Sequence, residues 1–94
     1  MKKKITILGS TGSIGKNMIE ILKKDKKNID IILLTANKNY NELIKQTKIF
    51  NVKNLLITNP TTFKIVKKKL KGKKINIYSN FNSIDYIFKN KKAD

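Results

Sequence analysis

The chain has 94 residues, a length that allows one small domain with a modest hydrophobic core. It contains no cysteine, which excludes a disulfide framework and thiol chemistry, and it contains no histidine. No apolar stretch approaches the length of a membrane span, and the lysines at positions 2–4 lead into a strand rather than a signal-peptide core. We therefore expect a cytoplasmic protein without a membrane segment.

The formal net charge is +16, with 22 basic and six acidic residues. Positive charge of this size is also the electrostatic signature of nucleic-acid binding. Every basic residue here is lysine, however, whereas arginine is the better bidentate reader of phosphates and bases. The densest run, over residues 67–74, falls at a predicted helix end, where lysines complement the helix dipole. We interpret the lysines as a solvated surface and their large number as a result of codon bias. We therefore expect no nucleic-acid partner.

The first predicted strand covers residues 5–8, a nearly continuous apolar run that is typical of a strand buried on both faces of a parallel sheet. Three glycines spaced three apart, with hydroxyl side chains between them, then occupy residues 9–15. After them, apolar residues at helical spacing predict a helix that packs back onto the sheet with one face: Ile14, Met18, Ile21 and Leu22. The glycines therefore lie in a strand-to-helix turn.

Each glycine of this turn has a predicted use. Gly9 permits a backbone path that is closed to other residues, Gly12 lets the main chain approach a ligand, and Gly15 allows close packing of helix on strand. The first N–H groups of the following helix have no internal partners and lie at the positive end of its dipole, so they attract phosphate. The context of strand, turn and helix is the one that a dinucleotide-binding motif requires.

Strands and helices continue to alternate along the chain. Further strands are predicted over residues 31–34, 54–58 and 75–78. A second helix is predicted from the capping-box pattern of Asn39 and Glu42, and a third from Asn59-Pro60 to the glycine at position 72. Inner faces of these two helices are assigned to Tyr40, Leu43, Ile44 and Thr47, and to Phe63, Val66 and Leu70. A last short helix is suggested by Phe81, Ile84, Ile87 and Phe88.

This alternation predicts an α/β fold, a Rossmann-type doubly wound parallel sheet built of right-handed βαβ units. A fifth strand is expected next at about the position where the sequence stops. We therefore expect residues 1–94 to be an incomplete domain, truncated after about four βα units.

The residues after the second strand indicate which nucleotide is bound. NAD-binding proteins place an acidic residue about 20 residues after the glycines, where it accepts hydrogen bonds from the ribose 2′-hydroxyl and repels a 2′-phosphate. In this window the chain has Asn37, Lys38 and Asn39, and no carboxylate. A lysine flanked by amides favours the 2′-phosphate of NADPH.

These features together resemble the 1-deoxy-D-xylulose 5-phosphate reductoisomerase family. The resemblance rests on the stretch Ile-Leu-Gly-Ser-Thr-Gly-Ser-Ile-Gly over residues 7–15, on Ala-Asn-Lys-Asn over residues 36–39, and on Leu43, Gln46 and Phe50. The chain departs from the family at two places. Many members have a glycine where this chain has Asn37, and members tend to have a proline where this chain has Asn-Val at residues 51–52. Both affect loops.

The resemblance implies an NADPH-dependent enzyme that rearranges and reduces its phosphorylated sugar substrate to 2-C-methyl-D-erythritol 4-phosphate in non-mevalonate isoprenoid biosynthesis. It implies a divalent metal, magnesium or manganese, and a homodimer at full length. Pyrophosphate contacts would come from Thr11, Gly12, Ser13 and Ile14, and 2′-phosphate and adenosine contacts from Asn37, Lys38 and Asn39. The catalytic domain, the C-terminal domain and the metal ligands would lie outside this chain, so we expect the chain alone to catalyse nothing.

Other interpretations stay open on the residues alone. Extended short-chain dehydrogenases and semialdehyde dehydrogenases, which are also NADP-binding Rossmann oxidoreductases, use a similar glycine spacing. A non-catalytic nucleotide-binding module or a basic RNA-binding module would belong to a different class. Steep salt dependence would indicate RNA binding, whereas preference for NADPH over NADH would indicate the dinucleotide site.

Overall fold

The computed structural model describes residues 2–80 of the chain. Four strands alternate with three α-helices and one 3-10 helix: β1 (Lys3–Ile7), α1 (Ser13–Lys23), η1 (Lys26–Asn28), β2 (Ile29–Ala36), α2 (Tyr40–Phe50), β3 (Asn54–Ile57), α3 (Pro60–Lys69) and β4 (Asn76–Tyr78). The order and type of these elements confirm the prediction, except that the 3-10 helix was not predicted. The helix predicted over residues 81–88 lies outside the described residues.

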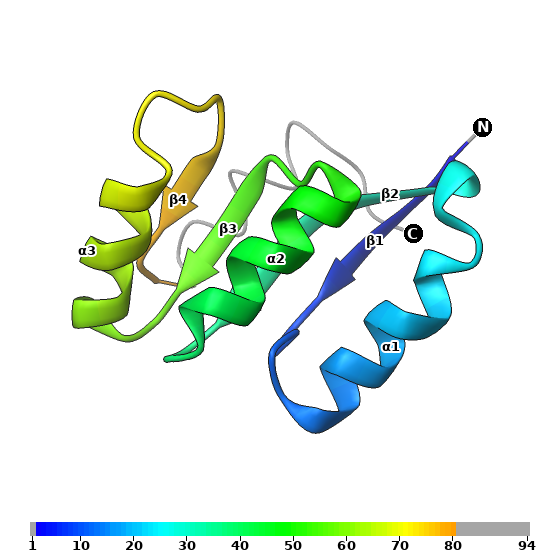
Figure 1. Cartoon of the computed structure of the whole chain (residues 1–94), viewed down its shortest axis with the longest axis horizontal. Coiled ribbons are helices and arrows are strands. Elements are labelled where there is room, and N and C mark those ends of the chain that lie inside the picture. The colour runs from blue at the N-terminus through cyan, green and yellow to red at the C-terminus, as the bar shows by residue number, and fades with distance from the viewer. Residues whose placement is uncertain (1, 81–94) are drawn as a thin grey trace.

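The four strands form one parallel sheet in the order β1-β2-β3-β4. Because every crossover moves one strand further in the same direction, α1, α2 and α3 lie on the same face of the sheet (Figure 1). The α/β, Rossmann-type parallel fold is thereby confirmed. Within residues 2–80 the strand order does not reverse, and β1 forms one edge of the sheet.

The core lies between the helices and the two central strands, β2 and β3. The main cluster joins strand residues such as Leu34, Leu55 and Ile57 to helix residues such as Leu43 and Val66. A second cluster on the opposite face contains Ile32, Leu33 and Leu56. These two strands are therefore buried on both faces, as continuous apolar runs predict.

The prediction that the first strand is buried on both faces was wrong. Ile5 and Thr6 are only partly buried, and Leu8, one residue after the end of β1, is 62% exposed. The physical reason is position, because among the strands of residues 2–80 β1 has a neighbour on one side only. An apolar run indicates that a strand tends to be buried. Here residues 2–80 do not supply all the side chains that would bury β1.

The predicted inner face of the first helix was also largely wrong. Ile14 is 83% exposed, Ile21 62% and Met18 43%, whereas Gly15 and Ile19 are the buried residues of α1. Of the predicted face, Leu22 packs partly buried against the core. Contact between Gly15 and the turn before the helix rotates α1, so that the buried stripe runs through residues 15 and 19.

A β-bulge divides β2 into two halves. Ile5 pairs with Ile31 but Thr6 pairs with Leu33, so Ile32 is an extra residue in β2. Ile29 and Ile31 belong to the cluster under the helices, Ile32 and Leu33 to the cluster on the other face. The inward positions then move from odd to even numbers, at Leu34 and Ala36.

Candidate nucleotide-binding site

The glycine-rich turn has the backbone geometry that the sequence predicts. Gly9 has φ +64°, in the left-handed region that favours glycine, and the Gly12 N–H donates to the Gly9 carbonyl at 3.0 Å. A Cβ on Gly15 would lie 2.6 Å from the Ser10 Cα, closer than real Cβ atoms approach a backbone. The turn is therefore folded back on the start of α1, which only glycine at position 15 allows.

The start of α1 presents unused backbone donors. Gly12 is its N-cap and supplies no side-chain hydrogen bond. Within residues 2–80, no acceptor binds the N–H groups of Ser13, Ile14 or Gly15. By contrast, Asn39 and Asn59 cap α2 and α3 with side-chain oxygens, as predicted. Of the three α-helices in the described part of the chain, α1 alone leaves the positive end of its dipole without a side-chain cap.

Buried polar groups of the second βα unit hold this turn. The Gly9 N–H donates to the Thr35 Oγ1 at 2.8 Å, and the Ser10 N–H donates to the Thr35 carbonyl at 2.9 Å. The Gln46 Nε2 donates to the Ser10 carbonyl at 2.9 Å. Sequence analysis did not identify Thr35 or Gln46 as parts of the site, although a glutamine among inward-facing positions of α2 was a visible signal.

The loop over residues 37–39 lies directly after β2 and so next to the turn that follows β1. The Asn37 Nδ2 donates to the Thr58 Oγ1 at 2.8 Å, which ties the loop to the end of β3. Asn39 is committed to capping α2. Lys38 is exposed, and within residues 2–80 no carboxylate forms an ion pair with it. The two segments predicted as a site thus lie together at the carboxyl ends of neighbouring parallel strands, where such sheets bind ligands.

Side-chain exposure distinguishes the predicted site residues. Gly12, Ser13 and Ile14 are exposed at the start of α1, Thr11 is partly buried, and Asn37 is exposed in the loop. Asn37 and Asn39 are engaged in hydrogen bonds within the chain, whereas the Lys38 ammonium is available to an external anion.

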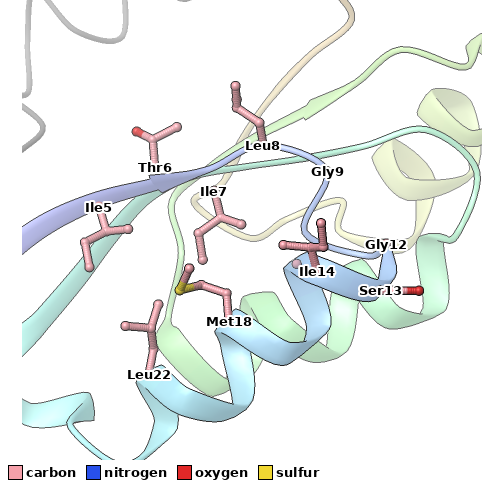
Figure 2. A pocket seen from close by; sticks show the side chains of 11 residues that line it. Ile5, Thr6, Ile7, Leu8, Gly9, Gly12, Ser13, Ile14, Met18 and Leu22 are labelled. Carbon is pink, nitrogen blue, oxygen red and sulfur yellow. The ribbon is translucent and has the colours of Figure 1, made fainter.

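An apolar groove runs from the turn along β1 and the facing side of α1 (Figure 2). It has a volume of about 620 Å³. Ile5 and Ile7 point from the strand toward Met18 and Leu22 of α1, and Thr6 and Leu8 point to the opposite side of the strand. The Thr6 Oγ1 is buried and has no hydrogen-bond partner within residues 2–80. The polar side chains that line the groove are Thr6 on β1 and Ser13 at the end where the turn lies.

The described residues bring no metal site together. Over residues 2–80 there is no group of three or more histidine, cysteine, aspartate or glutamate side chains that could hold a metal ion. None of the helices in this part of the chain is long and apolar enough to cross a membrane. What the site offers is backbone N–H groups, hydroxyls and one lysine, a set suited to binding phosphate groups.

Comparison with known proteins identifies the family. A family model described as 1-deoxy-D-xylulose 5-phosphate reductoisomerase matches residues 5–94. The chain belongs to this reductoisomerase family. A 1-deoxy-D-xylulose 5-phosphate reductoisomerase of Pelagibacter ubique is 53% identical over 93 residues, and one of Buchnera aphidicola is 43% identical over 74 residues. These alignments cover 98% and 79% of this chain but 24% and 19% of the relatives.

Solved structures of reductoisomerases have the same fold. The Zymomonas mobilis enzyme, solved in complex with NADPH, superposes with a TM-score of 0.81 at 26% identity, over 93% of this chain and 23% of that one. A reductoisomerase solved in complex with magnesium gives a TM-score of 0.83 at 22% identity, which supports the fold alone. The chain thus spans about a quarter of the length of the reductoisomerases that it matches.

Proposed function

We propose that this chain is the NADPH-binding part of a 1-deoxy-D-xylulose 5-phosphate reductoisomerase. The observation that carries the proposal is the uncapped start of α1, whose first three N–H groups find no acceptor within residues 2–80, held beside the Lys38 loop. A phosphate-bearing ligand would bring negative charge to that positive helix end. The 26% identical Zymomonas mobilis enzyme, whose structure contains NADPH, supports this choice of ligand.

The residues present fit this cofactor. A Cβ on Gly12 would meet only the Gly9 carbonyl, at 3.5 Å, so the chain itself leaves open space at Gly12. Thr11, Gly12, Ser13 and Ile14 would hold the pyrophosphate with backbone N–H groups and hydroxyls. Across the loop, Asn37, Lys38 and Asn39 would take the 2′-phosphate and adenosine. Bound NADPH would supply the hydride, and the role of this chain would be to bind and orient it.

The activity of the whole enzyme would need residues outside this chain. We infer that the longer protein converts 1-deoxy-D-xylulose 5-phosphate to 2-C-methyl-D-erythritol 4-phosphate, a step of non-mevalonate isoprenoid biosynthesis, with a divalent metal. The metal does not fit the described part of this chain, because residues 2–80 contain no cluster of ligands for it. A phosphorylated sugar substrate, a homodimer and a cytoplasmic location remain predictions.

We also propose that residues 1–94 are an incomplete domain and that the domain continues beside β1, the edge strand of the sheet within residues 2–80. The relatives are about four times as long as the stretch that they share with this chain. The apolar groove beside β1 is lined by Met18 and Leu22 of α1, and Met18 is 43% exposed. A further parallel strand would cover the edge, and a helix would cover the exposed side of α1.

The cofactor proposal is tested by titrating the chain with NADPH and with NADH and following backbone amide NMR signals, which detect even weak binding. We expect the signals of residues 11–14 and 37–39 to shift, and the shifts to saturate at a lower concentration of NADPH than of NADH. Gly12→Asp should abolish binding because it adds bulk and negative charge at the phosphates.

Thr61→Asp is the matched control, because it places the same carboxylate in the first turn of α3, at another exposed position. It should leave NADPH binding intact. Equal saturation by NADPH and NADH, or survival of binding in Gly12→Asp, would contradict the proposal.

A further inference from the structure

One buried side chain connects the glycine-rich turn to α2. Gln46 is fully buried, with 0% of its side chain exposed, and lies 36 residues along the chain from Ser10. Its Nε2 donates to the Ser10 carbonyl at 2.9 Å and to the Glu42 Oε2 at 3.1 Å. Both partners are acceptors only, so the amide nitrogen must be the group that faces them.

This contact fixes the orientation of the peptide group between Ser10 and Thr11. The chain has no cis peptide bond among its described residues, so the carbonyl of Ser10 and the N–H of Thr11 point in opposite directions. Because Gln46 holds the carbonyl toward the buried side of α2, the Thr11 N–H is directed away from α2. No acceptor within residues 2–80 binds that N–H.

Thr35 cannot perform the same task. It accepts hydrogen bonds from the Gly9 and Ser10 N–H groups, which fixes the turn before Ser10. Gln46 acts on the next peptide group, the one that leads into residues 11–14. The two side chains therefore fix successive parts of the turn from the same neighbouring βα unit.

Core filling alone does not account for a glutamine at this position. The Gln46 Oε1 is buried and has no hydrogen-bond partner within residues 2–80. An unsatisfied buried acceptor costs free energy that an apolar side chain of similar volume would not. The benefit that offsets this cost lies in what the Nε2 group holds.

We propose that Gln46 is a positioning residue for pyrophosphate: it orients the Ser10–Thr11 peptide so that the Thr11 N–H faces the ligand. The proposal rests on the proposed function, since it assumes that the turn binds a dinucleotide. It assigns to α2 of the second βα unit a direct part in shaping the phosphate site of the first.

The test compares Gln46→Met with Thr47→Val. Methionine has a similar volume and no donor, whereas Thr47 is the next residue of α2, also buried, and its hydroxyl bonds within the helix to the Leu43 carbonyl. Each variant is titrated with ADP-ribose, which carries the pyrophosphate, and with adenosine 2′-monophosphate, which carries the 2′-phosphate without a pyrophosphate.

Gln46→Met should weaken ADP-ribose binding about tenfold, the effect of one lost charge-assisted hydrogen bond, and should change binding of adenosine 2′-monophosphate much less. Thr47→Val should leave the binding of both ligands unchanged. A general destabilisation of the fold would instead weaken the binding of both ligands to the same extent. Equal weakening of both, or no change in ADP-ribose binding, would overturn the positioning role.

A second measurement needs no ligand and separates this proposal from the cofactor proposal. In the free chain, Gln46→Met should shift the backbone amide NMR signals of Thr11 and Gly12, and Thr47→Val should leave them in place. Glu42→Ala, which removes the other acceptor of the Gln46 amide, should shift them in the same direction by less. Unmoved Thr11 signals would refute the positioning role, whereas failure of the unsubstituted chain to bind ADP-ribose would refute the cofactor site.

Discussion

The centre of the sheet and its β1 edge are built from similar apolar sequences but reach different degrees of burial. Leu33, Leu34 and Leu55 in β2 and β3 have 0% of their side chains exposed, while Leu8 and Ile14 at the β1 edge are 62% and 83% exposed. The difference shows that the centre holds the described fold together. The edge is held by pairing with β2 and by Ile7 and Ile19, which join the main cluster, while Leu8 and Ile14 stay largely exposed.

The largest effect is expected in the centre. Leu34→Ala should lower the free energy of unfolding by about 2–5 kcal/mol, because it removes a fully buried side chain and leaves a cavity. Leu8→Ala is the matched change at the edge, where little contact is lost, and should cost about 0.5 kcal/mol or less. Urea unfolding followed by circular dichroism measures both. If the two variants lost similar amounts of unfolding free energy, the centre and the edge would not differ in their contribution to stability.

A smaller loss is expected where the edge contacts the turn. Gly15→Ala should destabilise the chain by about 1–3 kcal/mol, because the new Cβ would lie 2.6 Å from the Ser10 Cα and would force α1 away from the turn. Asn17→Ala, at an exposed position of the same helix, adds helix propensity without a clash and should be neutral or slightly stabilising. Thermal unfolding compares them, and a neutral Gly15→Ala would show that close packing is not required there.

The smallest effect is expected on the open side of α1. Ile14→Gln should change the free energy of unfolding by less than about 0.5 kcal/mol, because the side chain is already largely in water. The informative control is Ile19→Gln, five residues along α1, where the side chain is only 2% exposed and the polar amide should be strongly destabilising. Chemical unfolding of the pair tests whether the buried stripe of α1 runs through residue 19, and a large loss for Ile14→Gln would contradict it.

Much of the fold could be predicted from the sequence because its signals are local. Asn39 and Asn59 cap their helices as expected, Gly9 takes a positive φ, and Gly15 closes the turn against its helix. The burial of β1 and of α1 could not be predicted. An apolar residue does not reveal whether the side chains that would bury it belong to the same stretch of chain.

The candidate site was predicted only in its outer parts. Residues 11–14 and 37–39 carry recognisable local patterns, and the structure brings the two segments together. Thr35 and Gln46 were missed as supports because their contacts join residues 26 and 36 positions apart. The Glu42 side chain was expected to complete a capping box, and its carboxylate instead accepts a hydrogen bond from Gln46. Contacts of this kind are set by the packing of α2 and leave no periodic signal.

The bulge at Ile32 gives β2 a change of phase between its two halves. Before it, odd-numbered residues face the helices, and after it, even-numbered residues do. Thr35 is thereby released from the helix-facing row, and its hydroxyl reaches the Gly9 N–H. If Ile32 were deleted, the remaining residues would keep their order, yet Thr35 would lie on the opposite side of the sheet. One surplus residue therefore works as a spacer between the half of the strand that builds the core and the half that serves the turn.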